Sequence, residues 1–244
     1  MKRRTFIKQS SAAGLALTSI PTLLLKQDME YSILELMGKS DIDLYGENIN
    51  LRKEAHDAFV NMKKAAYQDG IKLEIVSSYR SFHRQEAIFE RKFLTYTEED
   101  GMKPLAAIEK IIEYSTIPGT SRHHWGTDID ITDGYRKVEG DLLVPEKFGA
   151  GGPFEDLKKW MDENSETYDF HLVYTDDPKR RGFKYEPWHY SYAPISIPML
   201  EAFRGKNITS LLAREEFYGA EHFTIGFLRT YIQDNILGIN KALL

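Results

Sequence analysis

Apolar side chains recur every three or four positions in four stretches of the chain, which is the spacing of one buried helix face. Each stretch also has a start signal, either a capping residue or a proline in its first turn. The spacing therefore predicts four helices: 51–69 capped by Asn50 and ended by Gly70, 82–93 capped by Ser81, one that starts at Pro104, and one that starts at Pro153.

Four shorter stretches have the alternation or the continuous apolar character of strands: 71–76, 128–132, 171–174 and 188–192. In the second of these, Asp128 and Asp130 are two positions apart, so both are predicted on one face of the strand. Because helices and strands do not alternate strictly, the pattern favours an α+β domain with a small antiparallel sheet flanked by helices.

Helical spacing returns near the C-terminal end, where Phe227, Leu228, Tyr231 and Ile232 form one apolar face. We therefore divide the chain into three parts: an N-terminal segment over residues 1–26, a main domain over residues 27–194, and a helical C-terminal extension over residues 195–244. The total of 244 residues is enough for one well-filled domain with such an appendage.

Charge is distributed unevenly along the chain. Residues 1–26 contain five Lys or Arg and no Asp or Glu, so the remainder is more acidic than the net charge of −5 shows. Phosphate binding needs clustered positive charge, so the acidic body argues against nucleic acid as a partner. The chain contains no cysteine, which excludes disulfides, a lipoprotein anchor and thiolate metal sites.

The basic N-terminal segment has the pattern of an export signal. Lys2–Lys8 is basic and Gln9–Leu25 is uncharged, and Arg3-Arg4 before Phe6 resembles the twin-arginine version. No Ala-x-Ala-like cleavage site is evident, so the segment could also remain as a membrane anchor; the alternative is a basic tail without a targeting role. We predict an exported protein of the periplasm or cell envelope.

Two short segments carry the candidate chemistry, Ser121-Arg-His-His-Trp-Gly-Thr-Asp-Ile-Asp130 and Glu186-Pro-Trp-His189. Together they offer histidine and carboxylate side chains, the donor types of a catalytic zinc site with three protein ligands and a nearby proton acceptor. A glycine inside the first segment lets the chain double back, and a proline inside the second marks a corner between loop and strand. The helical His-Glu-x-x-His motif is absent, which excludes the ordinary helix-based zinc protease.

With the upstream Ser78-Tyr79-Arg80-Ser81, these segments are similar to the VanY-type D-alanyl-D-alanine carboxypeptidases. That zinc peptidase group also includes D-Ala-D-Ala dipeptidases and some L,D-carboxypeptidases, and the resemblance covers roughly residues 51–192. It implies that Zn²⁺ is bound by three residues: His123, Asp130 and His189. It also implies that Glu186 is the general base and that Arg80 meets the substrate carbonyl or the developing oxyanion.

Two further positions of the first segment are candidates for substrate binding. Ser121 either hydrogen-bonds the substrate or only shapes the turn. Asp128 departs from the family pattern, which usually has a small residue there. It faces the same way as Asp130, so it could compete for the metal or bind a cationic group of the substrate. The competing interpretation is that Asp128 accepts a hydrogen bond from a zinc-ligating histidine and orients it.

The resemblance implies a zinc-dependent peptidase that removes a terminal D-alanine from peptidoglycan stem peptides. Two alternatives remain on the same fold: an L,D-carboxypeptidase or endopeptidase, and a protein that binds peptidoglycan without cleaving it. The loops that form the pocket walls determine which peptide bond is cleaved. The polar, glycine-rich segment 136–152 is expected to form one such wall.

The N-terminal segment generates a prediction about export. Replacing Arg3 and Arg4 together by Lys should block twin-arginine transport and leave the protein in the cytoplasm, which cell fractionation and immunoblotting measure. Normal export of this variant would point instead to the general secretory route, or to no dependence on the segment.

Overall fold

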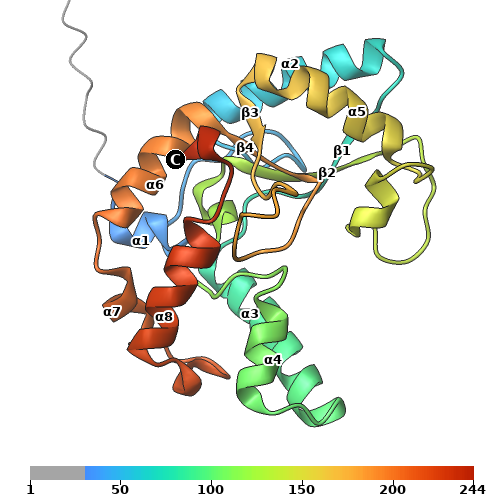
Figure 1. Cartoon of the computed structure of the whole chain (residues 1–244). Coiled ribbons are helices and arrows are strands. Elements are labelled where there is room, and N and C mark those ends of the chain that lie inside the picture. Colours follow the sequence, from blue (N-terminus) through green and yellow to red (C-terminus); the bar gives the residue numbers. More distant parts are fainter. Residues whose placement is uncertain (1–30) are drawn as a thin grey trace, which may run out of the picture.

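The computed structural model describes residues 31–244, and its elements are drawn in Figure 1. In chain order they are α1 (Ile33–Leu36), α2 (Lys53–Gln68), β1 (Leu73–Ser77), α3 (Phe82–Leu94), α4 (Pro104–Ile111), β2 (Asp128–Asp133), α5 (Glu155–Asn164), β3 (Phe170–Leu172), β4 (His189–Tyr192), α6 (Ala193–Arg204), α7 (Ile208–Leu212) and α8 (Ile225–Tyr231). Helices surround one small sheet, so the predicted α+β class is confirmed.

The sheet has four strands in the order β1-β2-β4-β3, and every neighbouring pair is antiparallel. Between β2 and β4, Asp130 lies opposite His189 and Asp128 lies opposite Ser191. Side chains directly opposite one another in an antiparallel pair share a face of the sheet. The pairing of β1 with β2 shifts in register just before Ser77, and such irregularities redirect a strand beside a functional site.

The two faces of the sheet have different surroundings. Helices α2 and α5 lie over one face, and their apolar residues share a core with Ile129 and Ile131 of β2 and with Tyr190 of β4. Strict alternation along β2 then directs Asp128 and Asp130 to the opposite face. The sheet therefore has one apolar face that anchors it and one polar face that carries the candidate chemistry.

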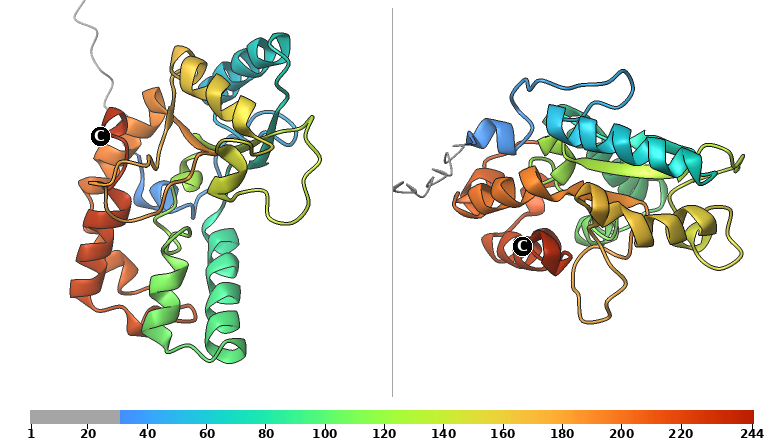
Figure 2. Two further views of the ribbon diagram at one scale, coloured as in Figure 1. Left: turned by 45° about the vertical axis from the view of Figure 1, so that its right-hand side comes forward. Right: turned by 90° about the horizontal axis from the view of Figure 1, so that it is seen from above.

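A second apolar core joins α3 and α4 to the helices of residues 193–244. In Figure 2, α3 and α4 lie side by side and project away from the sheet, with α8 next to α4. Phe89 and Ile108 of α3 and α4 belong to the same core as Leu228 and Tyr231 of α8. The helical character of residues 195–244 agrees with the sequence pattern, and the division of the chain at residue 194 stays a prediction.

Several element boundaries differ from the sequence pattern. The Asn50 cap is wrong: α2 begins at Lys53 because the Arg52 backbone N–H is bonded to Gly126 and its side chain donates to the Trp125 carbonyl at 2.7 Å. The Ser81 cap of α3 is confirmed, since its hydroxyl accepts the Arg84 backbone N–H. The strands and α5 agree with the pattern to within two residues at most ends.

The predicted export signal of residues 1–26 lies outside the described residues. Within residues 31–244, no helix is long and apolar enough to cross a membrane.

The C-terminal region contacts the loop before the first motif through one buried phenol. The Tyr231 hydroxyl accepts the Ile117 backbone N–H at 3.0 Å and lies 2.8 Å from the Thr120 hydroxyl. The Thr120 hydroxyl in turn donates to the Ile117 carbonyl at 2.7 Å. Burial raises the pKa of Tyr231, so it stays a neutral donor and acceptor.

This contact predicts that Tyr231→Phe destabilises the protein. The substitution leaves the buried Ile117 N–H without an acceptor, which costs about 1–3 kcal/mol of unfolding free energy. Denaturant unfolding of the full chain measures the loss, and Tyr218→Phe at an exposed position is the matched control. Equal stability of the two variants would show that the loop does not depend on this hydroxyl.

Candidate metal centre

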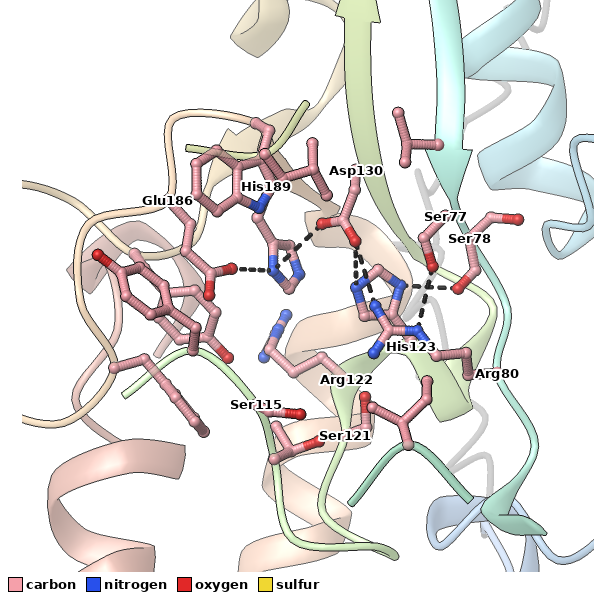
Figure 3. A pocket seen from close by; sticks show the side chains of 18 of the residues that line it. Ser77, Ser78, Arg80, Ser115, Ser121, Arg122, His123, Asp130, Glu186 and His189 are labelled. Atoms are coloured by element: carbon pink, nitrogen blue, oxygen red, sulfur yellow. Dashed lines mark hydrogen bonds and ion pairs between the residues drawn. The ribbon is translucent and has the colours of Figure 1, made fainter. Parts of the chain in front are cut away.

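Three strand and turn positions bring the predicted ligands together (Figure 3). His123 lies in a 3₁₀ turn at Arg122–Trp125, and Gly126 follows with a left-handed φ of 67°, a conformation that glycine adopts without strain. The chain then enters β2, which carries Asp130, while β4 presents His189 opposite it. All three side chains are buried.

The three side chains lie close enough together for one metal ion to contact all of them. The metal-facing atoms lie within 4.8 Å of one another, with His123 Nε2 3.3 Å from Asp130 Oδ2 and His189 Nδ1 3.7 Å from Asp130 Oδ1. Ligands about 2.0–2.1 Å from zinc in a tetrahedron are about 3.3 Å apart. Asp130 Oδ1 is buried and has no hydrogen-bond partner among the described residues, as expected of a metal ligand.

The other nitrogen of each histidine is held by the protein. His123 Nδ1 donates to the Ser78 carbonyl at 2.7 Å, and His189 Nε2 lies 2.9 Å from Asp128 Oδ2. These bonds fix the rings so that His123 Nε2 and His189 Nδ1 face the cluster. The ligand set is therefore pre-oriented by the fold.

The pKa shifts in the cluster follow from burial and charge. Burial and the Arg80 guanidinium lower the pKa of His123, which favours the neutral ring that binds metals. For Asp130, burial would raise the pKa, but the neighbouring histidines and Arg80 outweigh it and lower the pKa to about 2. Burial would lower the pKa of His189, yet the surrounding carboxylates raise it to about 10, so a metal must displace a proton there.

Glu186 lies at the corner before β4, where Pro187 and Trp188 form a turn. Its Oε2 is 3.0 Å from His189 Nδ1, so the carboxylate reaches the cluster from the loop side. Burial raises the pKa of Glu186, and the Asp130 charge adds to the shift although the contact with His189 opposes it. A raised carboxyl pKa brings a general base closer to working pH.

Arg80 is held beside the cluster by three hydrogen bonds. Its guanidinium donates to Ser77 Oγ at 3.1 Å, to Gln85 Oε1 at 2.9 Å and to Asp130 Oδ2 at 3.1 Å. Its backbone carbonyl accepts from His124 Nδ1 at 2.7 Å, and His124 Nε2 accepts the Gly119 N–H. The buried His124 ring thus holds the Arg80 backbone in place. The role of Arg80 toward the substrate stays a prediction.

Asp128 lies behind His189 and does not line the pocket. Its Oδ2 is 3.0 Å from Arg122 Nε, in addition to the His189 contact, and its Oδ1 accepts from the hydroxyls of Thr127 and Ser191, each at 2.7 Å. A fully buried carboxylate with these four partners favours the orienting interpretation over a contact with substrate. The sequence had left both open.

The cluster opens into a cavity of about 1100 Å³ whose walls differ in charge. Helix α3 contributes Arg84, Arg91 and Lys92, none of which forms an ion pair within residues 31–244. The lining also includes Asp141 and Glu146 from the segment 136–152, which lines the cavity as the sequence predicts. A cavity of this size accommodates a short peptide.

The sequence alone did not single out two residues of this site. Arg122 occupies the position between Ser121 and His123, and Gln85 lies one helical turn after Ser81. Only the spacing from a motif residue could have indicated them. Two buried histidines and an aspartate that could hold one metal ion, with a further carboxylate beside them, are the arrangement found in metal-dependent hydrolases.

Comparison with known proteins gives the family. The family model for D-alanyl-D-alanine carboxypeptidase, VanY, matches residues 48–195. The chain is 32% identical over 176 residues to the protein YodJ of Bacillus subtilis, covering 70% of this chain and 54% of YodJ. It is 28% identical over 152 residues to a D-alanyl-D-alanine carboxypeptidase of Enterococcus faecalis, covering 62% of this chain and 50% of that protein.

A solved structure has the same fold. VanYB in complex with D-alanine-D-alanine superposes with a TM-score of 0.52 at 24% identity, covering 73% of this chain and 92% of that chain. The chain therefore belongs to the VanY D-alanyl-D-alanine carboxypeptidase family, which confirms the resemblance drawn from the motifs. It spans about half the length of these two curated relatives.

The position of Asp128 generates a prediction about zinc affinity. Replacing this acceptor by Asn should weaken the hold on His189 and lower zinc affinity about 10- to 100-fold, the usual effect of removing such a partner. Competition with a chromophoric chelator measures the affinity. Asp133→Asn, on the same strand but away from the cluster, is the control. Unchanged zinc affinity in Asp128→Asn would contradict the orienting role.

Proposed function

We propose that this protein is a zinc-dependent peptidase that removes a terminal D-alanine from peptidoglycan stem peptides. The observation that carries the proposal is the conjunction of three features in one cavity: three buried candidate ligands, an Asp130 oxygen that has no hydrogen-bond partner within residues 31–244, and Glu186 at 3.0 Å from a His189 nitrogen. The family supplies the substrate class, since its relatives include D-alanyl-D-alanine carboxypeptidases.

The chain's own residues divide the chemical work. A zinc ion held by His123, Asp130 and His189 supplies Lewis-acid activation of water and of the substrate carbonyl. Glu186 accepts the proton of the attacking water on a carboxylate oxygen and returns it to the nitrogen of the leaving amine. Arg80 donates an N–H to the carbonyl oxygen as negative charge develops there, which typically contributes a few kcal/mol.

Two alternative functions are compatible with the same site. An L,D-carboxypeptidase or an endopeptidase would use the same residues and differ in the cavity walls. A non-catalytic peptidoglycan-binding protein is less consistent with the site, because such a protein has no need of a buried base beside an intact ligand set. The family of cell-wall peptidases supports a location in the cell envelope, and export or anchoring through residues 1–26 belongs to this proposal.

The proposal predicts that mutating the general base and mutating a zinc ligand have different effects on zinc content. Glu186→Gln should retain stoichiometric zinc while turnover of an acetylated peptide ending in D-Ala-D-Ala falls at least about 100-fold, because the proton acceptor is lost. His189→Ala should lose zinc and turnover together. Elemental analysis and D-alanine release measure both variants beside the wild type.

Two outcomes would contradict the proposal. If purified wild-type protein contains no stoichiometric metal, the zinc site is wrongly assigned. If Glu186→Gln keeps near wild-type turnover, Glu186 is not the general base.

A further inference from the structure

The end of the chain contacts the sheet next to the metal cluster. The family model stops at residue 195, and the chain continues through α6, α7 and α8 before it returns to the sheet (Figure 1). There the Asn240 backbone N–H donates to the Val173 carbonyl at 2.9 Å, and its side-chain Nδ2 donates to the Leu172 carbonyl at 2.9 Å. Asn240 thus holds the end of β3 and the residues that follow it, 172–174, which we call the bridging segment.

The bridging segment also holds the candidate base and one candidate ligand. The Val173 N–H donates to the His189 carbonyl at 3.0 Å, and the Tyr174 carbonyl accepts the Glu186 N–H at 3.1 Å. The Tyr174 ring packs edge-on against the His189 ring, with the ring centroids 5.1 Å apart. Val173 and Tyr174 are both buried. The bridging segment therefore connects Asn240 to the backbone of both site residues.

Further contacts fix the loop that follows the bridging segment. Arg180 Nε donates to the Thr175 carbonyl at 3.0 Å, and its Nη1 donates to the Gly238 carbonyl at 3.2 Å. Gly182 has a left-handed φ of 86°, and a Cβ at this position would collide with the Asp234 carbonyl oxygen. The loop and the C-terminal region therefore meet backbone to backbone, with no space for a side chain between them.

The position of these backbones matters for the chemistry of the site. Asp128 fixes only the ring of His189, through Nε2, while the bridging segment fixes its backbone. A group that orients a metal ligand commonly contributes about 10- to 100-fold to metal affinity or activity. A displacement of about 1 Å far from the chemistry can cost about 100-fold in rate. A residue that fixes His189 and Glu186 together is therefore expected to affect both zinc binding and proton transfer.

We propose that Asn240 is a positioning residue for the metal centre. It holds the bridging segment against His189 and Glu186, so zinc affinity and turnover depend on a residue outside the part of the chain that the family model matches. The inference rests on the proposed peptidase function and goes beyond it, because it gives the region after residue 195 a role in the site.

The test uses Asn240→Asp in the full chain. This substitution keeps the size of the side chain and the Oδ1 that accepts the Ala242 N–H at 3.1 Å, but it removes the Nδ2 donor to the Leu172 carbonyl. Asn207→Asp is the matched control. Asn207 accepts the Ser210 N–H at the start of α7, is exposed and does not line the cavity.

Zinc affinity and turnover are measured well below the unfolding midpoint of each variant. In Asn240→Asp, competition with a chromophoric chelator should show zinc affinity about 10-fold lower, and kcat on an acetylated peptide ending in D-Ala-D-Ala should fall by about 10-fold. KM should change less than kcat, since Asn240 does not line the cavity. Asn207→Asp should match the wild type. A merely structural role would lower only the unfolding free energy, and unchanged zinc affinity and kcat would overturn the inference.

Arg180→Met provides a second variant if Asn240→Asp does not fold. It keeps the length of the side chain and removes the donors to Thr175 and Gly238. The same losses of zinc affinity and kcat are expected, and wild-type values of both would overturn the inference.

Hydrogen exchange separates this inference from the proposed function, because it requires neither zinc nor substrate. If wild-type protein binds no zinc or hydrolyses no peptide, the proposed function fails. Exchange of the Val173 and Glu186 backbone amides still tests the positioning role, and it should be several-fold faster in Asn240→Asp than in Asn207→Asp. Equal exchange of these two amides in both variants would overturn the inference.

Discussion

The site depends first on the register of β2 against β4. Asp130 and His189 face each other across the antiparallel pair, and so do Asp128 and Ser191 one step along. A slip of one residue would turn every one of these side chains to the apolar face over α2 and α5. The apolar alternation that fixes the sheet in its core therefore also fixes the metal ligands, and fold stability and site geometry are specified by the same residues.

A second constraint is charge balance on the buried side of His189. Asp128 is a carboxylate without solvent contact, which is costly unless it is paired and hydrogen-bonded. Arg122 supplies the countercharge, and two hydroxyls complete the acceptor's partners. Asp128 and Arg122 thus belong together, because the buried acid is paired with a buried cation six positions earlier in the chain.

The sequence predicted the fold class, most elements and the segments that form the site, because hydrophobic spacing and the motifs are local signals. It placed the α2 start wrongly, since Arg52 is held by the distant Trp125 and Gly126, a contact that no local pattern shows. For the same reason it left the role of Asp128 open. The orienting role requires Arg122 and His189 beside the Asp128 carboxylate, and the substrate contact requires the cavity there. Tertiary packing decides which of these surrounds the carboxylate.

The strand order has a consequence for the order of folding. Residues 189–192 form β4, the strand that enters the sheet between β2 and β3, so the sheet closes only when segments about sixty residues apart meet. Such long-range pairing is slow compared with helix formation. Until it occurs, β2 has an open edge beside Asp128 and Asp130, and charged side chains on an open strand disfavour pairing with another chain. The carboxylates that belong to the site in the folded protein thus also disfavour aggregation of the partly folded chain.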